Sequence, residues 1–166
     1  MTTDDDRSSG QNWNLRDPSV LLATGFGIGL IPVAPGTWGS LFAVLVAWEM
    51  FGTLGMLGLA LGAIGAFGVG VRVSGDCIRK YESQDPKQVV IDEIAGQWLV
   101  LLVAGHNMTH YALAFVLFRI FDILKPWPVS WADREIKGGL GVMVDDVLAG
   151  LYAAAVLFAM IQWMGV

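Results

Sequence analysis

Long apolar stretches dominate this chain, and its charged residues are confined to the segments between them. No Asp, Glu, Lys or Arg occurs between Asp17 and Glu49, between Glu49 and Arg72, or after Asp146. About 20 apolar residues suffice to span the hydrocarbon core of a bilayer. The pattern therefore predicts helices that cross a membrane.

Glycine and proline predict where those helices begin and end. Residues 25–40 contain five glycines and two prolines, which do not permit a regular helix, so residues 18–37 are predicted to be a re-entrant or interfacial segment. The expected fold is all-α, an integral membrane helical bundle of about four short spans plus this N-terminal Gly-Pro segment. Residues 1–17 are expected to be a disordered cytoplasmic tail and residues 18–166 a single membrane-embedded domain. Apolar helices are predicted over residues 38–51, 54–71, 92–104, 111–124 and 146–163, with turns at 52–55 and 105–110.

The cations are distributed asymmetrically about these predicted helices. If the N-terminus lies inside, the outside turns carry no Lys or Arg, which agrees with the positive-inside rule. Arg119 lies within a predicted helix, in the half nearer the inner face. The other cations all fall in inside segments: Arg7, Arg16, Arg72, Arg79, Lys80, Lys87, Lys125, Arg134 and Lys137.

Composition narrows the class of protein further. The chain has 166 residues, of which 55% are hydrophobic and only 15% charged, with a formal net charge of −5. Soluble domains carry about a quarter charged residues, so disorder and nucleic-acid binding are disfavoured. One cysteine excludes an internal disulfide, and the two histidines do not form a zinc motif.

Five carboxylates are expected to lie at one depth, at the inner face. Asp92 and Glu93 begin one predicted helix, Asp122 lies near the end of the next, and Asp145 and Asp146 begin the last. Acidic residues at a helix N-terminus are also explained by capping and by the helix dipole. Asp122 is at the wrong end for that explanation, and a simple ion pair with the residue three positions earlier, Arg119, is its structural alternative.

The residue types at this face predict phosphoryl chemistry with a hard metal ion. Carboxylates without Cys or His select Mg²⁺, and nearby cations (Arg119, Lys125, Arg134, Lys137) suit phosphate. No motif for a protein nucleophile occurs, which favours attack by water. Backbone N–H groups of the Gly-Pro segment, with the hydroxyl of Thr37, are expected to approach a phosphate, although a glycine-proline kink needed only for packing explains the same residues.

Three strings resemble one known family. They are residues 25–40 (GFGIGLIPVAPGTWGS), 91–98 (IDEIAGQW) and 118–150 (FRIFDILKPWPVSWADREIKGGLGVMVDDVLAG). In order and spacing they are similar to the bacterial phosphatidylglycerophosphatase A family. The resemblance implies a Mg²⁺-dependent enzyme of the bacterial cytoplasmic (inner) membrane. Such an enzyme crosses the membrane several times, with its active site on the cytoplasmic side. It converts the phospholipid phosphatidylglycerophosphate to phosphatidylglycerol.

The resemblance also carries over a set of motif residues, whose roles we infer from chemistry. Glu93, Asp122, Asp145 and Asp146 are expected to hold one or two Mg²⁺, with Asp92 as a fifth catalytic carboxylate. Thr37, Arg119, Lys125 and Arg134 are expected to bind the substrate phosphate, and Asp133 is a further motif position. Two alternatives stay open at this point. One is a phosphatase of another lipid phosphate such as a prenyl phosphate, and the other is a small transporter component.

Overall fold

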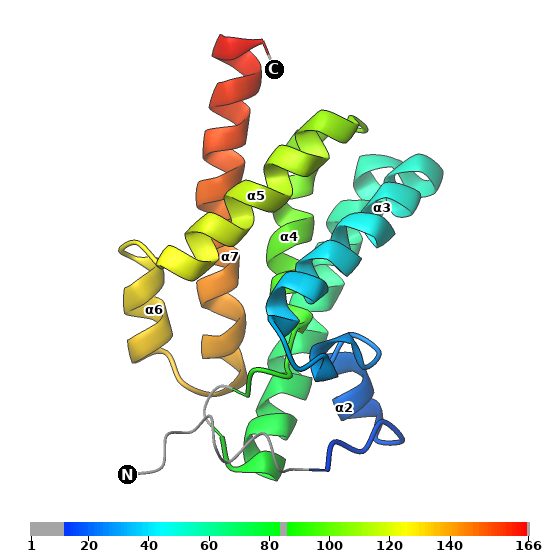
Figure 1. Cartoon of the computed structure of the whole chain (residues 1–166), viewed down its shortest axis with the longest axis vertical. Helices are drawn as coiled ribbons and strands as arrows, with labels where there is room; N and C mark the ends of the chain where they lie inside the picture. Colours follow the sequence, from blue (N-terminus) through cyan, green and yellow to red (C-terminus); the bar gives the residue numbers. More distant parts are fainter. Residues whose placement is uncertain (1–11, 84–85, 166) are drawn as a thin grey trace.

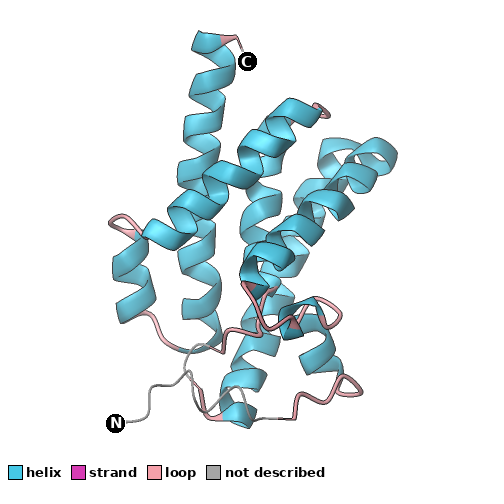
Figure 2. Ribbon diagram, viewed as in Figure 1, coloured by secondary structure: helices cyan, strands magenta, loops and turns pink. Residues whose placement is uncertain are grey.

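The structure is a computed structural model that describes residues 12–83 and 86–165. Every regular element in these ranges is a helix (Figure 2), as the all-α prediction requires. The elements, in chain order, are α2 (Pro18–Ala23), the 3₁₀ turn η1 (Ile28–Leu30), α3 (Pro35–Tyr81), α4 (Ile91–Ala104), α5 (Met108–Leu124), α6 (Val129–Glu135), α7 (Gly138–Ala159) and the π-helical turn η2 (Met160–Met164).

α3 consists of two helical arms. Gly55 interrupts the helix with φ +66° and ψ −168°, a conformation that glycine adopts without steric cost. The chain reverses direction at this point (Figure 1). The turn predicted at residues 52–55 is therefore present, with one arm before it and a second arm that reaches Tyr81.

α4 lies at the centre of the bundle, between α3 and α7, while α5 crosses over both α4 and α7 (Figure 1). One apolar core surrounds Leu101, Phe118 and Leu157, which join α4, α5 and α7. A second core surrounds Val20, Cys77 and Met143, which join α2, the second arm of α3 and the start of α7. The beginning of α4 therefore lies among three other helices.

The N-terminal segment packs on the second arm of α3. Asp17 caps α2 through Ser19 N and accepts a hydrogen bond of 2.7 Å from Lys80, and the Trp13 ring stacks on Tyr81 with 3.9 Å between centroids. Residues 12–17 are thus docked, contrary to the expected disordered tail, because they carry a helix cap and an aromatic ring with nearby partners. Residues 1–11 of that tail lie outside the described residues.

The last helix begins earlier than predicted. Instead of a loop to residue 145, the chain forms α6 and then α7 from Gly138. The glycines that suggested a loop allow close packing: a Cβ on Gly139 would overlap the backbone oxygen of Val71. Tertiary contact thus outweighs the low helix propensity of glycine.

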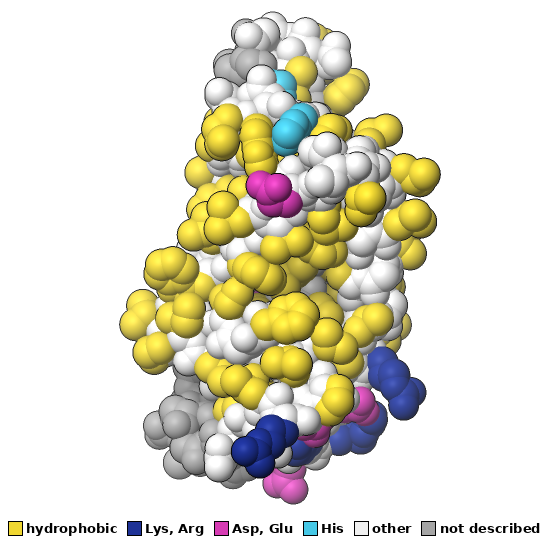
Figure 3. Space-filling model, turned by 90° about the vertical axis from the view of Figure 1, so that its right-hand side faces the viewer, with side chains coloured by type: hydrophobic (Ala, Val, Ile, Leu, Met, Phe, Trp, Pro, Cys, Tyr) yellow, Lys and Arg dark blue, Asp and Glu magenta, His cyan; other side chains and the backbone are white. Residues whose placement is uncertain are grey.

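Within residues 12–83 and 86–165, two helices are long and apolar enough to cross a membrane, α3 and the segment Gly138–Trp163. Leu57, Ile64 and Phe158 are among the many large apolar side chains left exposed, and Figure 3 shows such side chains covering the middle of one face. Lys and Arg gather at the lower end of that view. These features are consistent with a membrane protein; the count of about four spans stays a prediction.

Candidate active site

A cavity of about 560 Å³ lies at the end of the bundle where α4 begins and α5 ends. It falls within the range of roughly 300–1,000 Å³ common for small-molecule sites. Helices α4, α5, α6 and α7 all contribute polar side chains to it. The charged lining residues are Lys87, Asp92, Glu93, Arg119, Asp122, Lys125, Asp133, Arg134, Lys137, Asp145 and Asp146.

Asp92 and Glu93 belong to the first turn of α4, as predicted. Free backbone N–H groups and the helix dipole favour negative charge there. The first turn of α3 packs closely over Glu93, since a Cβ on Gly36 would overlap Glu93 Oε1. Glycine at this position lets the two helix beginnings meet, and the Glu93 carboxylate is thereby kept near the cavity.

Asp145 and Asp146 do not begin a helix. α7 starts at Gly138, so both carboxylates lie about two turns inside it, where no free N–H groups remain to be capped. The position at a helix N-terminus therefore explains in part why residues 92 and 93 are acidic, but it does not explain why residues 145 and 146 are acidic.

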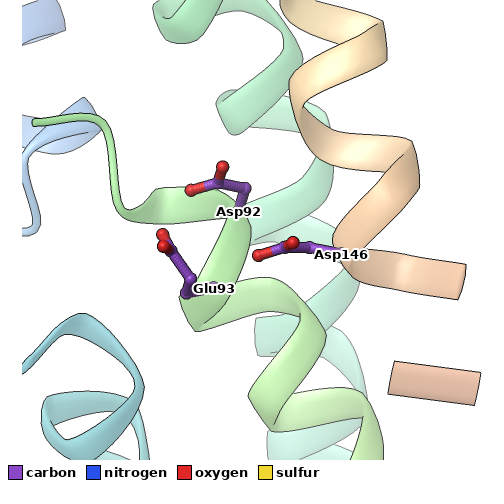
Figure 4. Close-up of side chains that lie close together, drawn as sticks. All are labelled: Asp92, Glu93 and Asp146. Atoms are coloured by element: carbon purple, nitrogen blue, oxygen red, sulfur yellow. The ribbon is translucent and has the colours of Figure 1, made fainter. Parts of the chain in front are cut away.

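Small residues let α4 and α7 approach so closely that Asp146 faces the start of α4. A Cβ on Gly96 would lie 2.7 Å from Asp146 O, and a Cβ on Gly150 would lie 2.8 Å from Gly96 O. As a result, ligand oxygens of Asp92, Glu93 and Asp146 lie within 4.8 Å of one another (Figure 4). We call these three residues the carboxylate cluster.

The carboxylate cluster fits a hard divalent cation. Glu93 Oε2 and Asp146 Oδ2 are buried and have no hydrogen-bond partner among the described residues. Asp122 and Asp145 lie near enough to repel the charge of Asp146. Buried like charges without compensation are costly, and oxygen ligands at this spacing are those that Mg²⁺ or Ca²⁺ prefers.

The opposite side of the cavity contains carboxylates that are already paired with cations. Arg119 Nη1 lies 2.7 Å from Asp122 Oδ2 and 3.9 Å from Glu93 Oε1. The same nitrogen donates a hydrogen bond of 3.3 Å to Ser40 Oγ. The Arg119–Asp122 pair considered from the sequence is thus present, and its guanidinium group is fixed beside the carboxylate cluster.

Lys125 links α6 to α7. Its ammonium group donates to Asp133 on α6 and to Asp145 Oδ2 on α7, the latter at 2.6 Å. Burial alone would lower the pKa of Lys125, but the carboxylates of Asp145 and Asp133 outweigh that effect and raise this pKa. Lys125 therefore stays charged and bridges the two helices.

Comparison with known proteins agrees with the motifs. A model of the family described as phosphatidylglycerophosphatase A matches residues 21–161. The chain belongs to the phosphatidylglycerophosphatase A family. It is therefore a phosphatase.

Relatives of this phosphatase support the assignment. Proteins named phosphatidylglycerophosphatase A from Escherichia coli and Haemophilus influenzae are 36% and 39% identical to it over 152 residues. These alignments cover 87% and 91% of this chain and 84% and 93% of the relatives. A Bacteroides thetaiotaomicron protein named putative phosphatidylinositol-3-phosphatase is 42% identical, covering 87% of this chain and 94% of its own length. No solved structure matches the chain.

In this member of the phosphatidylglycerophosphatase A family, most residues selected from the sequence line one cavity. The four expected metal ligands line the cavity. Glu93 and Asp146 belong to the carboxylate cluster. Asp122 forms an ion pair with Arg119, and Asp145 forms one with Lys125. Asp92, expected as catalytic only, completes the cluster. All three expected phosphate-binding cations (Arg119, Lys125, Arg134) line the cavity, but Thr37 is not among the lining residues.

One cation of the cavity, Lys87, was not linked to the site from the sequence, whereas Lys137 was named there as a nearby cation that suits phosphate. Lys87 lies in the segment before α4, and Lys137 immediately precedes α7. The only sequence signal for Lys87 is its position five residues before Asp92, in a polar inside segment. That segment carries other cations as well, so the fold was needed to place Lys87 at the site.

Proposed function

We propose that this chain hydrolyses the terminal phosphomonoester of phosphatidylglycerophosphate, releasing phosphatidylglycerol and phosphate, with Mg²⁺ as its cofactor. The observation that carries the proposal is the carboxylate cluster beside Arg119, in a cavity at the charged end of an apolar helical bundle (Figures 3 and 4). The names of the Escherichia coli and Haemophilus influenzae relatives supply the substrate.

Asp92, Glu93 and Asp146 would hold the metal, with Asp122 and Asp145 adjacent to it. Bound there, Mg²⁺ supplies positive charge that acidifies an attacking water and stabilises charge on the phosphoryl oxygens. Arg119, fixed by Asp122, places a second positive charge at the cluster. It can bind a phosphoryl oxygen without having to reorganise first.

Water is the favoured nucleophile. Among the described residues that line the cavity there is no Ser, Thr, Cys or His, and Cys77 is buried in the core beside α2 instead. The carboxylates closest together are those that would hold the metal. Direct transfer of the phosphoryl group to water needs no covalent enzyme intermediate, and a phosphoenzyme trapped during turnover would contradict this mechanism.

The direct test measures phosphate release from phosphatidylglycerophosphate in mixed detergent micelles. We expect activity that disappears with EDTA, returns with excess Mg²⁺ and is unaffected by EDTA already saturated with Mg²⁺. Full turnover in EDTA would contradict the metal proposal, and absence of turnover with Mg²⁺ would contradict the substrate proposal.

A second candidate substrate follows from the Bacteroides relative, whose name refers to phosphatidylinositol-3-phosphatase. Phosphatidylinositol 3-phosphate also presents a phosphomonoester on a lipid head group, so the same cluster could act on it. The two lipids offered at equal surface concentration separate the candidates. We expect kcat/KM to be higher for phosphatidylglycerophosphate; the reverse order would favour the inositol lipid.

We further propose that the protein crosses the bacterial inner membrane several times, with the cavity on the cytoplasmic side, because the cations gather at the cavity end. Cysteines introduced by Arg79→Cys and Met108→Cys test this, since both positions are exposed and lie at opposite ends of the bundle. A membrane-impermeant thiol reagent should label Met108→Cys in spheroplasts and Arg79→Cys only in inverted vesicles. The wild type is the control, because its one cysteine, Cys77, is fully buried.

A further inference from the structure

Four of the cations that line the cavity, those on α5, α6 and the segments next to them, are of two kinds. Arg119 and Lys125 form ion pairs with carboxylates that also line the cavity. Arg134 and Lys137 are exposed, line the same cavity, and form no ion pair with any described residue. Arg119 is already assigned to the phosphate at the carboxylate cluster, so Arg134 and Lys137 have their charges available for a further anionic group of a ligand.

The two available cations lie away from the carboxylate cluster. Arg134 belongs to the last turn of α6, and Lys137 is the residue at the N-cap of α7. Asp146 follows Lys137 by nine residues of α7, which places it about 13 Å further along the helix axis at 1.5 Å per residue. Arg134 and Lys137 thus lie toward the rim of the cavity, and a phosphate bound at the carboxylate cluster is adjacent to Arg119 instead.

The substrate of the proposed function carries a second anion roughly 7 Å from the first, the length of six extended covalent bonds, so the long side chains of Arg134 and Lys137 have to extend toward the cluster to reach it. Phosphatidylglycerophosphate has a terminal phosphomonoester and, across a glycerol bridge of three carbons, the phosphodiester that joins the head group to diacylglycerol. When the phosphomonoester lies at the carboxylate cluster, the phosphodiester must lie on the side where the lipid enters.

We infer that Arg134 and Lys137 form a binding site for the phosphodiester of the lipid, separate from the group that is hydrolysed. This inference rests on the proposed function and names which part of the substrate each set of cations recognises. Guanidinium and ammonium groups are suited to phosphate oxygens, Arg in a bidentate manner and Lys as a point charge.

The surroundings of α6 support this assignment. Trp127, just before α6, is 75% exposed, and Trp131, within α6, is 48% exposed. Tryptophan is enriched at the level of lipid head groups, where the phosphodiester of a bilayer lipid also lies. The same short helix therefore presents an interfacial aromatic surface and an available cation.

Lys125 keeps this site in position. It bridges Asp133, the residue before Arg134, to Asp145, the residue before Asp146. One ammonium group thus sets the distance between the rim of the cavity and the carboxylate cluster. This geometry selects for a substrate with two phosphates at one spacing, and a phosphomonoester that lacks the second anion gains nothing from Arg134 or Lys137.

The test separates the two phosphates of the substrate by inhibition. Phosphatidylglycerol retains the phosphodiester and lacks the phosphomonoester, whereas inorganic phosphate has no phosphodiester. For Arg134→Gln and Lys137→Gln we measure kcat and KM for phosphatidylglycerophosphate, and inhibition constants for phosphatidylglycerol and for inorganic phosphate, in mixed micelles. Arg72→Gln is the matched control, because Arg72 is exposed, lies on the second arm of α3 and does not line the cavity.

Each single variant should raise KM, and the inhibition constant of phosphatidylglycerol, by about tenfold, as expected for loss of one charge-assisted hydrogen bond. kcat and the inhibition constant of inorganic phosphate should stay within about twofold, as for Arg72→Gln, because these depend on the cluster and on Arg119. A fall in kcat at constant KM, or an equal rise in both inhibition constants, would assign these residues to the hydrolysed phosphate and overturn the inference. An inhibition constant for phosphatidylglycerol that does not change in the variants would overturn the inference as well.

The wild-type measurement distinguishes this inference from the proposed function. If the wild type releases no phosphate from phosphatidylglycerophosphate, the proposed function fails before any variant is compared. If the wild type is active and the variants do not show the expected split, only the phosphodiester site fails. A melting temperature recorded for each variant confirms that the compared proteins are folded.

Discussion

The two sides of the cavity use the same residue types in opposite ways. On the side of α4, the carboxylate cluster includes Glu93 Oε2 and Asp146 Oδ2, which are buried and have no hydrogen-bond partner among the described residues. On the side of α5 and α6, Asp122 is paired with Arg119, and Asp133 is paired with Lys125. The first side crowds three carboxylates together with Arg119 3.9 Å from Glu93, whereas Asp122 and Asp133 on the second side each have a cation at ion-pair distance.

This difference shows which carboxylates are available for a ligand. An ion pair formed within the protein stabilises local structure, while carboxylates that outnumber the cations beside them are stabilised by a bound cation. We therefore expect substitutions on the α4 side to affect the reaction, and substitutions on the α5 side to affect the fold as well.

The largest effect is expected for Asp146→Asn. The change removes one charge from the carboxylate cluster at almost constant volume, so activity should fall at least about a hundredfold, as at other disturbed metal sites. The melting temperature without metal should not fall, because repulsion among the carboxylates decreases. Phosphate release and thermal unfolding, with and without Mg²⁺, are measured on the same preparation.

Glu49→Gln is the control for that substitution, since Glu49 is exposed on the first arm of α3 and does not line the cavity. It should leave both activity and the Mg²⁺-induced rise in melting temperature unchanged. A destabilised Asp146→Asn enzyme with a normal rate would show that Asp146 has a structural role only, and the two sides of the cavity would then not differ.

On the paired side, Asp122→Asn should reduce stability. Arg119, whose side chain is only 15% exposed, then loses its carboxylate at 2.7 Å. The expected loss in free energy of unfolding is about 2 kcal/mol, as for a half-buried charge without its partner. Thermal unfolding in detergent measures it.

A double variant makes the test of the ion pair specific. Asp122→Asn combined with Arg119→Gln should recover part of the lost stability, because no uncompensated charge remains. Additive losses in the double variant would mean that the ion pair contributes nothing, and that Asp122 resembles the carboxylates on the α4 side.

The smallest effect is expected where the two sides meet, at Gly36. A Cβ on Gly36 would overlap Glu93 Oε1 and lie 3.2 Å from Arg119 Nη1. Gly36→Ala should therefore displace Glu93 and reduce activity by about tenfold, a typical loss when a ligand is misplaced by its support.

Gly65→Ala is the matched control for that change. A Cβ on Gly65 has no neighbour within 4 Å, so this variant should keep wild-type activity. Equal activities for the two alanine variants would show that close packing over Glu93 does not position it.

Much of the helical pattern was predictable because it depends on local properties of the chain. Asp92 and Glu93 begin α4 and Asp122 lies near the end of α5, as predicted from apolar runs and their boundaries. The turn near Gly55 was also predictable, since few other residues adopt φ +66°. The start of α7 was not, because its glycines have low helix propensity and the close packing of Gly139 on the second arm of α3 depends on the tertiary structure.

By itself, the sequence determined that apolar helices carry carboxylates near one end, because hydrophobic periodicity and helix boundaries depend on neighbouring residues. It also determined the family, through the three motif strings. Only the tertiary structure decided which carboxylates stand together and which are paired. That choice depends on close contacts such as Gly96 with Asp146 and Gly36 with Glu93, which join residues far apart in the chain.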